Sequence, residues 1–133
     1  MIKFKYEKLE HEFYKIDNRL QGIIFFIAGY VNNKWNQDIT LTHLIRTQAE
    51  QDEIYKTTEG YKASPWISVH QVLRGADVST TEMVRHRIDE LVSVTNNLYY
   101  YSEKYNTALY HDIGLGAHIH LQVPDKAGRQ HFL

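Results

Sequence analysis

The sequence contains no cysteine, which excludes a disulfide scaffold, a cysteine-ligated zinc or iron–sulfur site and a cysteine nucleophile. Only 2 prolines and 7 glycines occur among 133 residues, too few for a long disordered linker. The formal net charge of −1 provides no basic excess to attract a nucleic acid. The most apolar run, residues 22–31, is about half the ~20 residues that a membrane-spanning helix needs. We therefore expect no nucleic-acid partner and no membrane partner.

The residues that are present suit a single globular domain, residues 1–133, with an apolar content of 43%. The first eight residues are polar and of mixed charge, unlike a secretory signal peptide, so we expect synthesis in the cytoplasm. Without cysteine, a metal site would have to use histidine, aspartate or glutamate. The 8 histidines are therefore the first candidates for chemistry.

Apolar side chains that recur every three or four residues predict one long helix over about 5–33, ending at Asn32-Asn33. Ser79 and Glu82 have the spacing of a capping box, which would start another helix. The other expected elements are a strand over 38–45, helices over 48–57 and 83–98, and strands over 107–111 and 118–123. Together they predict an α+β fold, a small antiparallel sheet with flanking helices.

Two segments concentrate side chains that bind metals. His118 and His120 are two residues apart on an expected strand, so both side chains lie on the same face. They could share a metal ion or a substrate, or simply be two surface histidines. His70 and Asp77 lie seven residues apart, and Gly75 between them permits a bend that would bring them together. Two imidazoles and one carboxylate form a ligand set used by catalytic zinc, which leaves the fourth position to water.

These segments resemble the zinc D-Ala-D-Ala carboxypeptidase superfamily, which also includes phage L-alanyl-D-glutamate endolysins and the hedgehog signalling domain. The spacing Ser68-x-His70-x6-Asp77 resembles the family signature Ser-x-His-x-x-Gly-x-Ala-x-Asp. The run from Ala117 to His120 is similar to the strand that carries the last ligand, especially in hedgehog. Upstream, the segment from Thr42 to Gln51 resembles the strand-then-helix segment SGYRSxxxQ.

The resemblance implies a hedgehog/DD-peptidase-like metal-binding core over about 38–124, with zinc held by His70, Asp77 and His120. It also implies that Arg46 faces the site, where a fixed cation can stabilise a developing oxyanion. His118 would be a second catalytic group, which polarises the substrate carbonyl or carries a proton. Zinc lowers the pKa of its bound water to ~7 and so makes a hydroxide available at neutral pH.

The general base of the family is missing from its usual positions. Many relatives carry a glutamate three residues before the last ligand, where this chain has Ala117. Hedgehog-like members carry one six residues before it, where this chain has Gly114. Peptide hydrolysis needs a group that takes a proton from water and passes it to the leaving amine. His118, His111 and Asp112 are the groups that could replace the glutamate.

The function that the resemblance implies is a zinc-dependent metallopeptidase that hydrolyses peptidoglycan stem or cross-link peptides containing D-amino acids. A compact hydrolase without a signal peptide suits a phage or prophage endolysin, released through a holin or carried by a virus particle. The missing glutamate leaves open a second interpretation, a non-catalytic zinc-binding domain of the same fold.

A third interpretation rests on the segment from His118 to Val123, which also resembles the histidine-triad motif of nucleotide hydrolases and transferases. Gln122 occupies the third motif position, as in the uridylyltransferase branch. In that case His120 would be the nucleophile that attacks phosphorus, and no metal would be needed.

Overall fold

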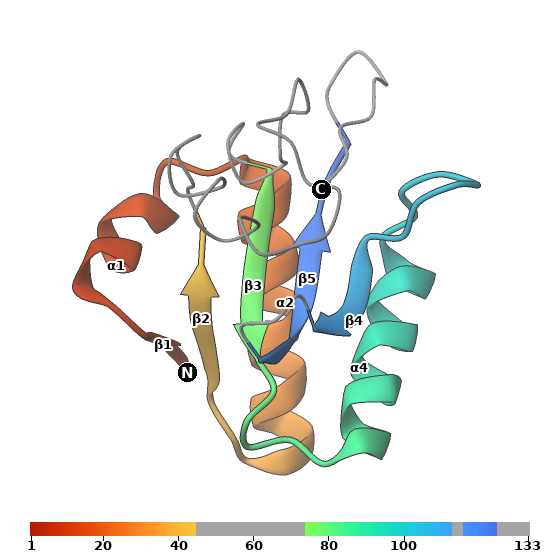
Figure 1. The fold of residues 1–133 in the computed structure, drawn as a ribbon, viewed down its shortest axis with the longest axis horizontal. Coiled ribbons are helices and arrows are strands. Elements are labelled where there is room, and N and C mark those ends of the chain that lie inside the picture. The colour runs from red at the N-terminus through yellow and green to blue at the C-terminus, as the bar shows by residue number, and fades with distance from the viewer. Residues whose placement is uncertain (45–73, 113–115, 125–133) are drawn as a thin grey trace, which may run out of the picture.

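The computed structural model describes residues 1–44, 74–112 and 116–124, which form an α+β fold (Figure 1). In chain order the elements are β1 (Ile2–Phe4), α1 (Glu7–Phe13), α2 (Asn18–Trp35), β2 (Ile39–His43), β3 (Gly75–Ser79), α4 (Arg85–Leu98), β4 (Ala108–Asp112) and β5 (Ala117–Gln122). The expected strands over 38–45, 107–111 and 118–123 are confirmed as β2, β4 and β5. The α+β class is confirmed as well.

The five strands form one sheet in the order β1-β2-β3-β5-β4. β2, β3, β5 and β4 pair antiparallel, but β1 runs parallel to β2, with Ile2 opposite Ile39. The expectation of a purely antiparallel sheet is therefore wrong, since the sheet is mixed. β1 has only three residues, too few for an alternating pattern to be distinguished from the start of a helix.

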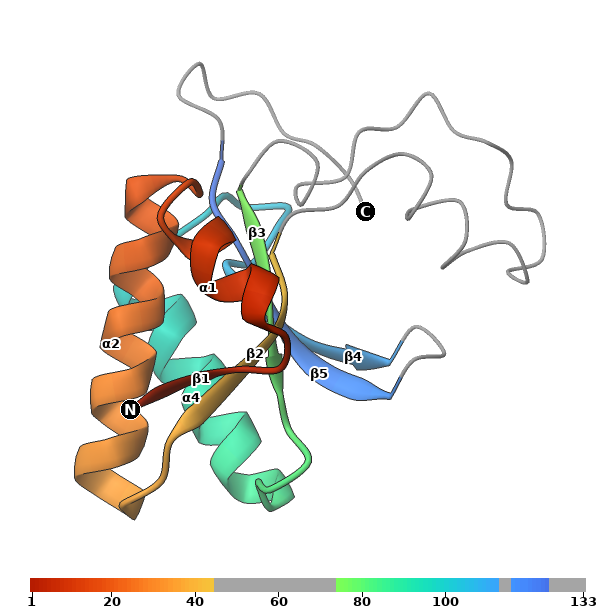
Figure 2. The ribbon, with the colours of Figure 1, turned by 90° about the vertical axis from the view of Figure 1, so that its left-hand side faces the viewer.

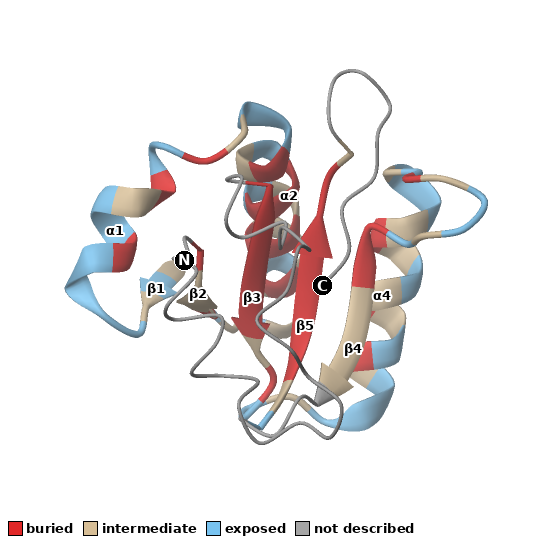
Figure 3. Ribbon diagram, turned by 45° about the horizontal axis from the view of Figure 1, so that its top comes forward, coloured by how far each residue is buried: buried red, intermediate tan, exposed pale blue. Residues whose placement is uncertain are grey.

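Helices α2 and α4 lie against one face of the sheet (Figure 2). The central strands β3 and β5 are buried almost throughout (Figure 3). On β5, Ile119 and Leu121 point into the core, while His118 and His120 belong to the opposite face. The buried side of α2 completes this core with Leu20, Ile23, Ile24, Ile27, Ala28 and Val31. The sheet therefore has one apolar face under the helices and one face where chemistry can occur.

The single helix expected over 5–33 is wrong, because the segment forms two helices. α1 ends at Phe13, and Asp17 starts α2 by accepting a hydrogen bond from the Arg19 backbone N–H at 2.8 Å. α2 passes the expected end at Asn32-Asn33 and ends at Trp35, capped by Asn36 in the left-handed conformation with φ 53°. Asparagine tolerates that conformation better than most residues, which makes it a good helix end.

The capping box expected at Ser79 to Glu82 is also wrong. Ser79 is the last residue of β3, held opposite His118 in the ladder, and α4 begins only at Arg85. Val84 precedes α4 without a side-chain capping bond. The helix expected over 48–57 lies outside the described residues. Among the residues that are described, no helix is both long and apolar enough to cross a membrane.

Candidate functional site

An irregularity in β2 brings a histidine to the open face of the sheet. The register between β2 and β3 shifts between Leu41 and His43, so that His43 pairs with Asp77. Without the shift, strict alternation would turn His43 toward the core and Leu44 away from it. In the structure Leu44 is fully buried, and the His43 Nδ1 atom lies 3.9 Å from Asp77 Oδ2. A bulge that re-aims a side chain in this way is common beside functional sites.

Asp77 is the centre of a histidine cluster. It is only 3% exposed and lies on β3 directly opposite His120 of β5. His120 Nδ1 is 3.0 Å from Asp77 Oδ1, and His118 Nε2 is 3.5 Å from the same oxygen. Donor atoms at the corners of a tetrahedral zinc site lie about 3.3 Å apart, because zinc–nitrogen bonds are about 2.0–2.1 Å long. The three atoms therefore converge at distances that suit a shared proton or cation.

A hydrogen-bond chain fixes the orientation of His120. The Gln122 side-chain amide donates from Nε2 to the Asn106 carbonyl oxygen at 2.8 Å, so its Oε1 faces His120 Nε2 at 3.1 Å. An amide oxygen only accepts, which assigns a proton to His120 Nε2. The other ring nitrogen then faces a carboxylate oxygen. That contact is attractive only if a second proton or a metal cation lies between Nδ1 and Asp77.

His111 on β4 extends the cluster. It lies opposite His118 in the ladder, with ring centroids 4.6 Å apart and the rings close to perpendicular. Its ring centroid is 5.6 Å from that of His120. Three histidines, His43, His118 and His120, therefore approach one buried carboxylate, and His111 packs against two of them. His111 is one of the three groups that could replace the missing glutamate, and it lies beside His118.

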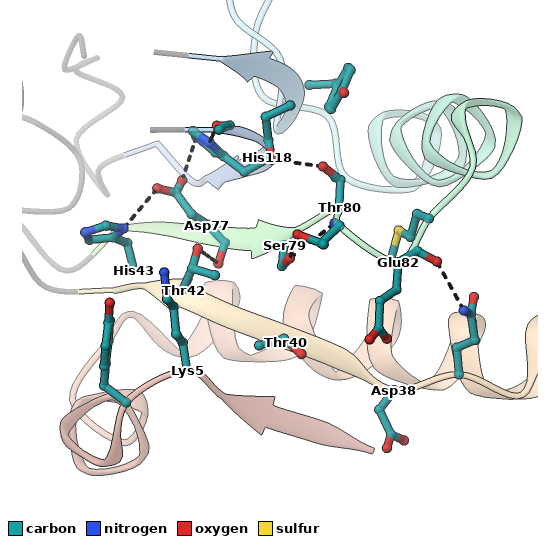
Figure 4. A pocket seen from close by; sticks show the side chains of 17 residues that line it. Lys5, Asp38, Thr40, Thr42, His43, Asp77, Ser79, Thr80, Glu82 and His118 are labelled. Atoms are coloured by element: carbon teal, nitrogen blue, oxygen red, sulfur yellow. Dashed lines mark hydrogen bonds and ion pairs between the residues drawn. The ribbon is translucent and has the colours of Figure 1, made fainter. Parts of the chain in front are cut away.

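The cluster opens into a groove of about 700 Å³ along the open face of the sheet (Figure 4). His43, Asp77 and His118 line one part of it, whereas Asp38 and Glu82 line another. His118 is 8% exposed and also approaches the Gly116 carbonyl oxygen with Nδ1, at 3.2 Å. His120 is fully buried behind it. A substrate in the groove would therefore meet His118 before His120.

The structure brings together three of the five residues that the sequence assigned to the site. Asp77, His118 and His120 are adjacent, whereas His70 and Arg46 lie outside the described residues. Within the described residues, no group of three or more His, Cys, Asp or Glu side chains is already arranged to hold a metal ion. The donor types and the spacing around Asp77 Oδ1 fit zinc, but the full predicted ligand set includes His70.

Sequence reasoning did not assign site roles to His43 and Gln122. His43 lies two residues after the buried Leu41, so strand alternation predicts that its side chain faces the core. The bulge turns the side chain to the opposite face. Gln122 was considered only for its place in a triad motif. Its period-two relation to His118 and His120 is the signal that places all three on the same face.

Comparisons with known proteins give no further assignment. No protein-family model matches the chain, and no curated protein matches it either. The case for a function therefore rests on the residues and on their geometry.

Proposed function

We propose that this protein is a zinc-dependent peptidase that hydrolyses D-amino-acid-containing peptides of the bacterial cell wall. The observation that carries the proposal is the approach of His120 Nδ1 to Asp77 Oδ1 at 3.0 Å, with His118 Nε2 3.5 Å from the same oxygen. Because the other nitrogen of His120 already donates to Gln122, a cation between Nδ1 and the carboxylate would resolve the local electrostatics.

His70, Asp77 and His120 would hold the zinc ion, which would supply a water molecule that is acidic enough to react at neutral pH. Gln122 orients His120 through its Nε2–H. His118 faces the groove, so it can donate to the carbonyl oxygen of a bound peptide or carry a proton to the leaving amine. Arg46 would stabilise the negative charge that develops on that oxygen.

The histidines take on particular importance because the usual glutamate is missing. His118 and His111 form an edge-to-face pair in which the His118 ring lines the groove. Such a pair could pass a proton away from the reacting centre. If it does not, the same residues would describe a non-catalytic zinc domain, which is the principal alternative.

The nucleotide interpretation has less geometric support. A nucleophilic histidine needs a free nitrogen that a phosphorus atom can approach. His120 is fully buried, and both of its ring nitrogens are engaged, one by Asp77 and one by Gln122. The burial and the two contacts of His120 therefore make it a poor candidate for a nucleophile.

The test is digestion of purified cell walls by zinc-loaded protein, followed by measurement of newly released amino groups. The peptidase proposal predicts release that a chelator abolishes and that zinc restores. His118→Gln should keep its zinc while turnover falls roughly 10²–10⁴-fold, the usual contribution of a general acid or base. His11→Gln, a change on exposed α1, is the matched control.

Bound zinc without any turnover would favour the non-catalytic domain. Chelator-insensitive cleavage of nucleotides would favour the triad interpretation instead. Release through a holin or carriage by a virus particle belongs to this proposal as well, and it becomes worth testing once cell-wall cleavage has been observed.

A further inference from the structure

The N-terminal strand brings a lysine to the groove. Ile2 and Phe4 pack against the core, so the alternation of β1 places Lys3 and Lys5 on the open face. The Lys5 backbone N–H donates to the Leu41 carbonyl oxygen at 2.9 Å, which fixes its position beside β2. This strand lies outside the segments that carry the family resemblance, so the resemblance assigns it no role.

Lys5 lines the same groove as His43, Asp77 and His118. Figure 4 shows its side chain extending from the end of β1 toward the part of the groove that holds His43 and Asp77. Adjacent strands lie about 4.8 Å apart, so β1 is about 10 Å from β3 across the sheet. One or two extended peptide residues span about 3.5–7 Å of this distance, and the long side chain of Lys5 covers the rest of it.

The charge of Lys5 is not neutralised by the described part of the chain. No described carboxylate lies within ion-pair distance of its ammonium group, which lies over the Tyr6 ring, 5.3 Å from the ring centroid. Lys3, two residues earlier on the same face, instead lies 3.8 Å from the Asp38 carboxylate. Lys5 is therefore a cation that is held in a groove and available to an anionic ligand.

The opposite part of the groove carries the Glu82 carboxylate. Asp38 also lines the groove, but it is paired with the amino group of Met1 at 3.3 Å and with Lys3 at 3.8 Å. A ligand with one anionic end would therefore lie in a single direction, with that end near Lys5 and away from Glu82.

We infer that Lys5 forms an anion subsite that binds a free carboxylate of the peptide substrate within one or two residues of the bond that is cut. The inference rests on the proposed function for the kind of ligand and for the position of the bond that is cut. It makes Lys5 a specificity-determining residue and directs the activity toward the carboxyl end of a peptide rather than the middle of a chain. It also gives a role to β1.

The experiment is a binding titration of the zinc-loaded full chain at pH 7 with two probes, N-acetyl-D-alanyl-D-alanine and its C-terminal amide. We expect the acid to bind the wild type about five- to tenfold more tightly than the amide, because a charge-assisted bond in a partly open groove contributes about 1 kcal/mol. Lys5→Gln should abolish this preference, and Lys5→Arg should retain it. Lys3→Gln removes the same charge from the same strand face and should leave the preference unchanged.

Equal affinity for acid and amide in the wild type would overturn the inference. An equal loss of the preference for the acid in Lys3→Gln and Lys5→Gln would overturn it too. Failure of both probes to bind at about 10 mM, above the range of weak complexes, would also overturn it. Turnover is measured separately. Acid-selective binding without cleavage would refute the peptidase proposal and support the Lys5 subsite. Cleavage without a preference for the acid would support the peptidase proposal and refute the Lys5 subsite.

Discussion

Replacing Gln122 with leucine tests the hydrogen-bond chain that orients His120. The substitution removes the acceptor 3.1 Å from His120 Nε2 and leaves that N–H buried, since the histidine is fully inaccessible to solvent. A buried donor without an acceptor costs about 1–3 kcal/mol. Leucine is close to glutamine in size, so a cavity adds little to this cost. We expect the free energy of unfolding of the metal-free protein to fall by about 1–3 kcal/mol.

The assay is urea unfolding, followed by far-UV circular dichroism, of the wild type, Gln122→Leu and Gln37→Leu. Gln37 is the matched control, because its hydrogen bonds to Glu82 and Arg87 lie at the solvent-accessible edge of the groove. The control should change the free energy of unfolding by less than about 0.5 kcal/mol. Gln122→Leu should also bind zinc about 10–100-fold more weakly than the wild type, because His120, a proposed ligand, loses its hydrogen-bond partner. If both variants unfold at the same urea concentration as the wild type, the assignment of the proton to His120 Nε2 is wrong.

Three further predictions concern Asp77, Glu90 and Asn36. Asp77→Asn should lower the zinc affinity roughly 10²–10³-fold, one ligand's share of a four-ligand site, while Asp38→Asn in the same groove should leave it unchanged. The assay is competition with a chelator, and equal zinc affinity of Asp77→Asn and the wild type would contradict the prediction. The pKa of Glu90 is lowered, mainly by its hydrogen bond to Lys34. The carboxylate therefore stabilises the fold at pH values above the ordinary glutamate pKa, and this contribution is lost as the pH falls through the lower pKa of the folded state. The stability difference between wild type and Glu90→Gln should therefore shrink on acidification, and a difference that is constant from neutral to acidic pH would refute the pairing. Asn36→Ala should destabilise the protein by about 1 kcal/mol and Asn36→Gly should not, because φ at this position is 53°. Equal unfolding temperatures of the two variants would show that the left-handed cap is unimportant.

The adjacency of Asp77, His118 and His120 in the candidate site was predictable because it depends on local rules. The period of two places His118 and His120 on one face of a strand, whatever the rest of the fold. The spacing around Asp77 then predicted a carboxylate beside them, and the antiparallel register of β3 and β5 brings Asp77 opposite His120. A short motif and a strand period were sufficient for this part.

Other features depend on long-range packing that no local pattern records. The bulge that turns His43 toward Asp77 is set by pairing between β2 and β3, since it also returns Leu44 to the core. β1 is stable as a strand only because it pairs with Ile39 to Leu41, and Lys5 reaches the groove only as a result. The division of the first helix was more local. Asp17 is a good N-cap that the continuous apolar pattern concealed.

The most direct test of the account is elemental metal analysis of the purified full chain beside a His70→Ala/Asp77→Ala double variant. The account predicts about one zinc ion per chain in the wild type, as in a site with three protein ligands, and none in the variant. Circular dichroism of both proteins would show whether the variant still folds. Wild-type protein that carries no metal, even after zinc is offered, would contradict both zinc interpretations and leave His118 to Gln122 to be tested as a nucleotide site.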